Sequence, residues 1–499
     1  MKKILSVFLA LLMICGTLVL ASCAENSGDD TQAAQTSASV IGDDDPAEPA
    51  ETEPQFSTNR YDGETFTIYA RTKQSSYSAT YIIAEEQNGD LVNDADYKVN
   101  CEVCDRFGVT LELMEASDPN STVANDIASG ECAYDMLLDR RSNLAKRALE
   151  GNLYDFNSLG IDLSAKWWDA NCVRDLTLKG KNYLMANSAC IAKVQGIRFF
   201  YFNKQIVKDY NLQDPYELYD NDQWTLDNFL QMVKGVSAPT TDGSLGTYGL
   251  VLETGDSNGV HMHMLTGCGV IYGSTDDTGN VTCIIGDQLD KIDQFFDKVN
   301  TVFKDSNCVL TMDQAVAADV NNEAAAASGK YDKSRALWAA GHFLFTHSSI
   351  SVSANFTEMQ DDYGCMPNPK YNSDQTEYAH KCDRYTLIWA IPNANEVNKQ
   401  RIADIMDYWC YEADQEIIPA YYDVTIKTKR FSESKASEIV DKIVSTARYE
   451  LIDIFDVSNL RTGLNEGYSS GSVSAKWNTY SKAINTQLKT LNSSIDALD

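Results

Sequence analysis

The chain has 499 residues, with 72 Asp or Glu against 41 Lys or Arg, which gives a formal net charge of −31. At about 150 residues per domain, this length predicts two or three domains. A surface of this sign repels polyanions and no basic stretch offsets it, so the composition argues against binding of DNA, RNA or anionic lipid headgroups.

The first 22 residues have the pattern of a signal peptide. Lys2 and Lys3 are followed by an apolar run from residue 4 to 20 and by the small residues that precede Cys23. The run is shorter than the ~20 apolar residues that span a bilayer, and no stop-transfer charges follow it, so a transmembrane helix is the weaker interpretation. The segment Leu-Ala-Ser-Cys resembles the lipobox of bacterial lipoproteins, which implies cleavage before Cys23 and lipidation (palmitate) of its side chain on the outer face of the cytoplasmic membrane.

Residues 23–59 are predicted to be a lipid-anchored, acidic, disordered linker. They are rich in Ser, Thr, Ala, Pro, Asp and Glu, and the first basic residue after the signal is Arg60. Such a segment buries too little apolar surface to offset the entropy lost on ordering. An acidic interaction tail is the alternative.

From residue 60 onward, strand-like and helix-like patterns alternate along the chain. They predict strands at 64–70, 109–114 and 134–138 and helices at 89–107 and 121–129. Strands separated by helices indicate an α/β fold with a parallel sheet, and ligands bind beyond the carboxyl ends of such strands. Asp139, Arg140 and Arg141 follow the third strand and are therefore candidate ligand-binding residues.

The second half of the chain gives weaker patterns. The spacing of apolar residues predicts a core-facing helix over 287–305, a helix over 312–327, a strand over 385–391 and helices from 398 to the end. No internal repeat is present.

The thirteen cysteines do not form an obvious disulfide framework. Cys15 leaves with the signal and Cys23 carries lipid, so eleven remain, and an odd number argues against a fully paired set. The short pairs Cys101/Cys104, His261/His263 and His380/Cys382 lack the spacing of a structural zinc site. We therefore predict no metal and no cofactor.

Signatures of the common enzyme classes are missing from the sequence. It contains no GxxxxGK[ST], HExxH or GxSxG motif, and no GxGxxG motif after a strand. Glycoside hydrolysis needs two positioned carboxylates, but 72 acidic residues make any such pair uninformative. We predict that the protein is not an enzyme.

Several segments, in order, resemble the extracellular solute-binding lipoproteins of ABC importers, of the large maltose-binding-protein-like carbohydrate type found in Firmicutes. Besides the lipobox at Cys23, they lie at 162–188, 198–204, 219–230, 363–378 and 417–430. The resemblance implies a two-lobed periplasmic-binding-protein-like (type II) α/β fold with an interlobe hinge. It assigns residues 60–190 and 341–395 to the N-terminal lobe, and residues 191–340 and 396–499 to the C-terminal lobe.

The resemblance also implies a function. A monomer would capture a solute, expected to be an oligosaccharide, between its lobes and deliver it to ABC permease subunits in the membrane. Two alternatives remain open: a secreted lipoprotein enzyme acting on glycans, and a sensory or adhesive surface lipoprotein.

Candidate ligand-binding residues are those that the implied topology places near the cleft, and about a third are expected to touch ligand. Aromatic faces would cover the apolar side of a sugar ring, and planar polar groups would bind its hydroxyls. The candidates are Tyr77, Asp139, Arg140, Arg141, Gln195, Arg198, His261, His263, Trp389 and Trp167. The adjacent Trp168 is the weakest candidate, because the turn that carries it can simply pack the lobe.

Overall fold

The computed structural model describes residues 54–72, 82–241, 244–255, 259–394 and 398–498. The expected signal peptide, Cys23, most of the linker and Tyr77 lie outside these residues. Contacts within the chain separate residues 1–55 from residues 56–499, and the second unit holds all of the structure discussed below. Among its described helices, none is long and apolar enough to cross a membrane.

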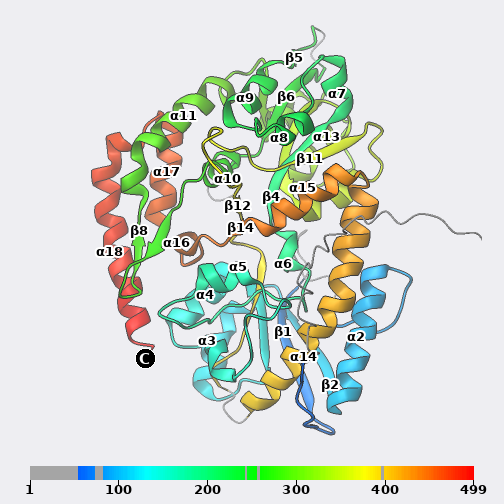
Figure 1. Ribbon diagram of the computed structural model, residues 1–499, viewed down its shortest axis with the longest axis vertical. Coiled ribbons are helices and arrows are strands. Elements are labelled where there is room, and N and C mark those ends of the chain that lie inside the picture. The colour runs from blue at the N-terminus through cyan, green and yellow to red at the C-terminus, as the bar shows by residue number, and fades with distance from the viewer. Residues whose placement is uncertain (1–53, 73–81, 242–243, 256–258, 395–397, 499) are drawn as a thin grey trace, which may run out of the picture. The chain divides into compact units, whose positions relative to one another are not determined.

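The first of two large sheets has the strand order β13-β3-β1-β2. Its strands are β1 (Thr65–Arg71), β2 (Thr110–Ala116), β3 (Met136–Arg140) and β13 (Leu387–Ala390). β1 pairs in parallel with both β2 and β3, and β13 adds to β3 in the antiparallel sense. Helices α2 (Leu91–Phe107), α3 (Asn120–Ser129) and α4 (Arg141–Leu149) connect or follow the first three strands (Figure 1).

Helix α2 shows why these segments fold as they do. The Asp90 carboxylate accepts hydrogen bonds from the backbone N–H groups of Val92 and Asn93, both at 3.0 Å, and so caps the first turn. Gly108 ends the helix in the left-handed conformation. Val92, Val99, Val103 and Phe107 share one buried face.

The second sheet has the order β11-β4-β10-β6-β5, and β9 also pairs with β6. Its strands are β4 (Arg198–Asn203), β5 (Ser237–Ala238), β6 (Thr247–Leu252), β9 (Val309–Thr311), β10 (Phe343–Ser349) and β11 (Tyr363–Met366). β6 is parallel to β9 and β10, whereas β4 runs antiparallel to β10 and β11. Every residue of β4 and β10 is buried, as expected for central strands covered on both faces.

The remaining helices complete the unit, together with a hairpin and short turns. They are α5 (Ala170–Leu176), α6 (Ala192–Gln195), α7 (Lys204–Asp209), α8 (Pro215–Asp220), α9 (Leu226–Lys234), α10 (Val260–Gly267), α11 (Leu289–Phe303), α12 (Met312–Ala318), α13 (Gly329–Ala339), α14 (Lys399–Ile418), α15 (Ser434–Ser445), α16 (Leu451–Ile454), α17 (Ser458–Ser470) and α18 (Trp477–Asp496). β7 (Gly273–Thr275) pairs with β8 (Val281–Cys283), and a π-helix, η5 (Pro419–Arg430), continues α14. The 3₁₀ turns are η1 (Phe156–Leu159), η2 (Ile285–Gln288), η3 (Ile350–Phe356) and η6 (Ser474–Lys476).

Three stretches of chain lie side by side between the two sheets, and we call them the crossing region (196–198, 380–384 and 446–449). The N–H of Asp383 donates to the carbonyl of Gly196 at 3.1 Å, and the N–H of Cys382 donates to the carbonyl of Arg448 at 2.8 Å. Within the region β12 (His380–Lys381) pairs in parallel with β14 (Ala447–Arg448). A few hydrogen-bonded segments joining two sheets have the construction of a hinge.

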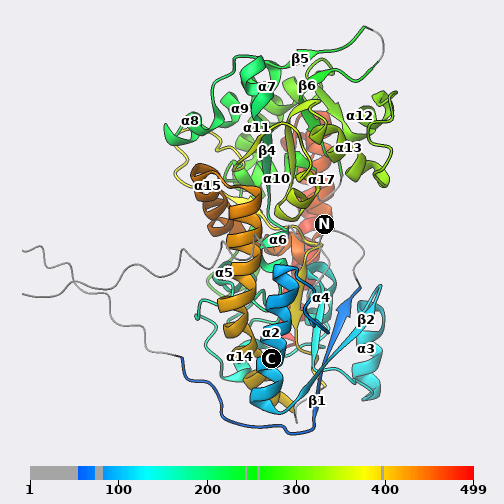
Figure 2. The ribbon, with the colours of Figure 1, turned by 90° about the vertical axis from the view of Figure 1, so that its right-hand side faces the viewer.

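The expected lobe boundaries are wrong at two places. β10 and β11 lie within 341–395 but pair with β4 and β6 of the second sheet, because their apolar residues need a neighbour on each side. α14 was assigned to the C-terminal lobe but packs along α2 beside the first sheet, as both views show (Figures 1 and 2). Its Trp409 ring lies 6.5 Å from the Phe66 ring of β1.

Two further expectations need correction. The linker assigned to 23–59 ends earlier, because Phe56 packs among Trp167, Tyr408 and Tyr411 and so begins the folded unit. The helix expected over 312–327 ends at Ala318, because the Asp319 carboxylate accepts the N–H groups of residues 323 and 324 and turns the chain. The eleven described cysteines are free thiols.

Candidate functional site

The carboxyl edge of the first sheet carries an ordered polar network. Arg71, at the end of β1, donates from Nε to Asp139 and from Nη2 to Asp118 at 2.8 Å. Asn143 of α4 donates to the other oxygen of Asp139 at 2.9 Å. Asp139 is fully buried, so this network fixes the end of β3.

Arg141 supports the crossing region from the same edge. Its Nη1 donates to the carbonyl of Asp383 at 3.0 Å, and its backbone N–H donates to the carbonyl of Thr386 at 3.1 Å. Its guanidinium carbon lies 4.5 Å from the centre of the Tyr449 ring. Because Arg141 is fully buried, its role here is to position the loop before β13.

The matching edge of the second sheet is built around Glu253, which follows β6. Arg198 donates to one carboxylate oxygen of Glu253, and Arg335 of α13 donates to the other at 3.1 Å. A second nitrogen of Arg198 lies 3.7 Å from a carboxylate oxygen of Asp383. A continuous chain of charged groups, Arg335–Glu253–Arg198–Asp383, therefore joins the carboxyl edges of the two sheets.

An exposed tyrosine stands at each of these edges. Tyr385 precedes β13, Tyr331 lies in the first turn of α13, and each side chain is 38% exposed. The Tyr331 hydroxyl lies 3.5 Å from the carbonyl of Thr254, next to the end of β6. The carboxyl edges of parallel strands are where α/β folds place ligands, so these edges form the candidate site.

The two candidate histidines lie in helix α10 rather than in a strand. His261 stacks on Tyr468 with ring centres 4.0 Å apart, and its Nε2 lies 2.7 Å from the Asn465 side-chain oxygen. Burial lowers the pKa of His261 to about 4. His263 is fully enclosed, its ring lies 5.2 Å from that of His347, and burial holds its pKa well below the usual value. Both rings are therefore neutral near pH 7, and no group of three metal-ligating side chains occurs within the described ranges.

The remaining candidates are packed inside the protein. Trp389 is 1% exposed, and Trp167 packs against Phe56 while donating to Asp407 at 2.8 Å. Trp168 also donates to Asp407, at 3.3 Å, and is 2% exposed. Gln195 is buried at the end of α6, before β4. The structure therefore brings Asp139, Arg140 and Arg198 to the two edges and encloses the tryptophans.

Sequence reasoning missed Glu253, Asp383, Tyr331 and Tyr385. Tyr385 begins the strand expected at 385–391, so the antiparallel return of that strand beside β3 was the available signal. Glu253 and Tyr331 gave no local signal, because the end of β6 and helix α13 that place them meet only in the folded chain.

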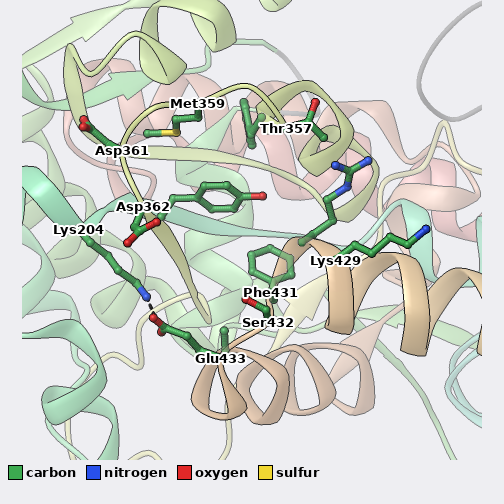
Figure 3. A pocket seen from close by; sticks show the side chains of 13 residues that line it. Lys204, Thr357, Met359, Asp361, Asp362, Lys429, Phe431, Ser432 and Glu433 are labelled. Carbon is green, nitrogen blue, oxygen red and sulfur yellow. Dashed lines mark ion pairs between the residues drawn. The ribbon is translucent and has the colours of Figure 1, made fainter. Parts of the chain in front are cut away.

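A separate cavity of about 350 Å³ lies at the other end of β4 (Figure 3). Lys204 and Glu433 point toward each other and form an ion pair across it, and Phe431 and Asp362 also line it. Since a strand rises about 3.3 Å per residue, Lys204 lies roughly 20 Å from Arg198. This cavity is therefore distinct from the two carboxyl edges.

Comparison of the sequence with protein-family models and with curated proteins finds no match. Solved structures do match the fold. A maltose/maltodextrin-binding domain from Bdellovibrio bacteriovorus bound to maltotriose superposes with a TM-score of 0.54 at 10% identity, covering 85% of this chain and 100% of that one.

Two further solved structures give similar agreement. An ABC substrate-binding protein from Listeria monocytogenes in complex with cycloalternan has a TM-score of 0.53 at 12% identity, covering 87% of this chain and 100% of that one. A cyclo/maltodextrin-binding protein complexed with maltotetraose has a TM-score of 0.52 at 14% identity, covering 86% and 97%. This chain therefore has the two-lobed, periplasmic-binding-protein-like α/β fold of the maltodextrin-binding proteins.

Proposed function

We propose that the protein is an extracellular solute receptor of an ABC importer, which captures a carbohydrate between its lobes and delivers it to a membrane permease. The observation that carries the proposal is the charged chain Arg335–Glu253–Arg198–Asp383, which joins the carboxyl edges of two sheets. Structures of the same fold contain maltotriose, cycloalternan and maltotetraose.

Binding rather than catalysis suits the carboxylates at these edges. Asp139 accepts hydrogen bonds from Arg71 and Asn143, and Glu253 accepts them from Arg198 and Arg335. A glycosidase needs one carboxyl group that is free to donate a proton and another that is free to attack or to activate water. These buried carboxylates are instead held in fixed positions by arginine and asparagine side chains.

The location of the receptor is also part of the proposal. The signal-like residues 1–22 and the lipobox cysteine at 23 support export and attachment by lipid to the outer face of the cytoplasmic membrane. We propose that the receptor acts as a monomer and that its partners are the permease subunits. Closure of the lobes around solute would create the form that the permease recognises.

A thermal-unfolding screen of the purified full chain tests the proposal. Oligosaccharides, peptides and divalent metals are added separately, and a solute that binds the native state raises its stability by about 2.7 kcal/mol at 100 times Kd. We expect an oligosaccharide to raise the melting temperature. Stabilisation by peptides alone would overturn the carbohydrate assignment, and no stabilisation by any solute would overturn the receptor function.

A matched pair of variants locates the site. Tyr331→Ala removes an exposed ring at the second edge, and Tyr210→Ala removes a partly exposed ring at the end of α7, on the far side of β4. We expect the first variant to weaken binding and the second to leave it unchanged. If Tyr331→Ala binds the solute as tightly as Tyr210→Ala does, the solute binds elsewhere.

A further inference from the structure

Arg140 differs from the other arginines at the carboxyl edges. Arg71, Arg198 and Arg384 each contact at least one carboxylate. The backbone N–H of Arg140 donates to Asp139 at 2.7 Å, but its guanidinium makes no ion pair or hydrogen bond with any residue in the described part of the chain. In a chain with 72 acidic residues, an arginine at a candidate ligand edge without a carboxylate partner is unusual.

Tyr385 holds this guanidinium in place without neutralising it. The guanidinium carbon of Arg140 lies 5.5 Å from the centre of the Tyr385 ring, and that of Arg384 lies 5.6 Å from the same ring. An aromatic face attracts a cation through its quadrupole but does not use the N–H donors as a carboxylate does. The planar donor fork of Arg140 therefore stays available to a ligand.

The support beneath Tyr385 is rigid. Its backbone N–H donates to the Asp383 carboxylate at 2.9 Å, and the neighbouring Arg384 donates to Asp456 at 3.0 Å. Arg140 itself is paired with Leu387 in the sheet. Donors placed on a fixed sheet edge lose little freedom when they bind, which favours selective recognition.

We propose that the solute is an anionic oligosaccharide whose carboxylate or sulfate group binds Arg140, with Tyr385 as the positioning residue. This inference rests on the proposed receptor function and adds the charge of the ligand. A guanidinium matches two oxygens of a planar carboxylate in a bidentate pair, so a uronate is the better fit of the two groups. At physiological ionic strength the net negative charge of the protein is screened beyond about 8 Å, so contact with Arg140 outweighs long-range repulsion.

The test measures calorimetric affinity of the full chain for a panel of oligouronates, their carboxyl-reduced neutral counterparts, sulfated oligosaccharides and neutral maltodextrins. We expect one anionic class to bind at least tenfold more tightly than its neutral counterpart. In Arg140→Gln, the Kd of the anionic class should rise ~10–100-fold, the range of a lost charged hydrogen bond. The affinity for the neutral counterpart should stay unchanged.

Two controls separate a specific contact from a general charge effect. Lys146→Gln removes the same charge from an exposed position further along α4 and should leave both affinities unchanged. Tyr385→Phe should retain selectivity for the anion, whereas Tyr385→Ala should reduce it, because only the ring positions Arg140. The uronate and sulfate arms identify which group binds.

Failure of this inference can be told apart from failure of the proposed receptor function. If only neutral oligosaccharides bind, or if Arg140→Gln weakens anionic and neutral binding equally, the inference is wrong and the receptor function stands. If no oligosaccharide binds, both are wrong. Loss of selectivity in Lys146→Gln would also overturn the assignment to Arg140.

Discussion

At the scale of single residues, Trp389 shows how a side chain typical of sugar binding can serve the core instead. It lies on β13, pairs with Leu138 of β3 and exchanges backbone hydrogen bonds with Met185. Its 1% exposure leaves no face for a ligand. The strand that carries Trp389 was predicted correctly, but its burial depends on residues from distant parts of the chain.

We therefore expect Trp389→Ala to lower the free energy of unfolding by about 3–5 kcal/mol, the usual cost of truncating a buried tryptophan. Solute affinity of the folded fraction should stay unchanged. Urea denaturation and calorimetry measure the two quantities separately. A loss of affinity at unchanged stability would instead place Trp389 at the ligand.

Glu450, next to β14, is a buried carboxyl group with an unusual titration. Burial raises its pKa to about 7, and Lys381 partly opposes this. One oxygen accepts the N–H of Tyr272 at 3.4 Å, while the other has no hydrogen-bond partner among the described residues. The folded protein thus binds this proton more tightly than the unfolded chain, whose glutamate pKa lies near 4.3.

Because burial raises the pKa of Glu450, the stability that this group contributes to the protein falls as the pH rises. The contribution of Glu450 to stability is fully present below about pH 4.3 and is lost as the pH rises through about 7, by an amount on the order of 3 kcal/mol. Glu450→Gln stays neutral, so this variant should be more stable than the parent at pH 8 and similar at pH 4. Urea midpoints at both pH values measure the effect, and equal midpoints at pH 8 would contradict it.

At the scale of elements, the local pattern predicted the first sheet well. The strands expected at 64–70, 109–114 and 134–138 became β1, β2 and β3 with ends shifted by at most two residues. Alternating polarity and a clear helix cap such as Asp90 act over a few residues, so these strands and this helix can be recognised from the sequence alone. The apolar run at 324–327 made the helix predicted over 312–327 too long. The Asp319 side chain turns the chain before that run.

The assignment of elements to lobes could not be predicted in the same way. α14 has apolar residues suited to any packed face, and only its contact with α2 decides which sheet it covers. The candidate ligand edges have the same difficulty, since Arg198 links Glu253 and Asp383 over long sequence separations. Ligand contact by Asp139, Arg140 and Arg198 stays a prediction.

One residue of α14 binds the entry segment of the folded unit at three places. Asp404 accepts hydrogen bonds from Ser57 and Asn59, both at 2.8 Å, and from the Tyr61 hydroxyl at 2.6 Å. Asp404→Ala should release this segment and lower the free energy of unfolding by about 1–3 kcal/mol. Limited proteolysis should then cleave near residue 60 much faster than in the parent.

A control at another helix makes that result specific. Asp290→Ala changes an exposed aspartate in the first turn of α11 and should not alter cleavage near residue 60. An unchanged cleavage rate in Asp404→Ala would show that Phe56 and its aromatic neighbours hold the segment without the carboxylate.

At the scale of the whole molecule, the proposed lipid anchor gives a direct prediction. Cys23→Ser removes the thiol that would be acylated, so the protein should move from the membrane fraction to the medium. Cys101→Ser, at an exposed position of α2, should leave it membrane-bound. Fractionation and immunoblotting measure this, and retention of the Cys23→Ser protein on membranes would contradict the anchor.

The crossing region has a consequence for how this protein reaches its native state. Arg141 and Asp383 are hydrogen-bonded across 242 positions of sequence, and β13 closes the edge of β3 only after the whole second sheet has been made. A nascent chain that stops before residue 387 leaves that edge unpaired and open to wrong partners. The first sheet thus cannot be finished early during synthesis. Residues 60–190 expressed alone would therefore lack a strand of their own sheet.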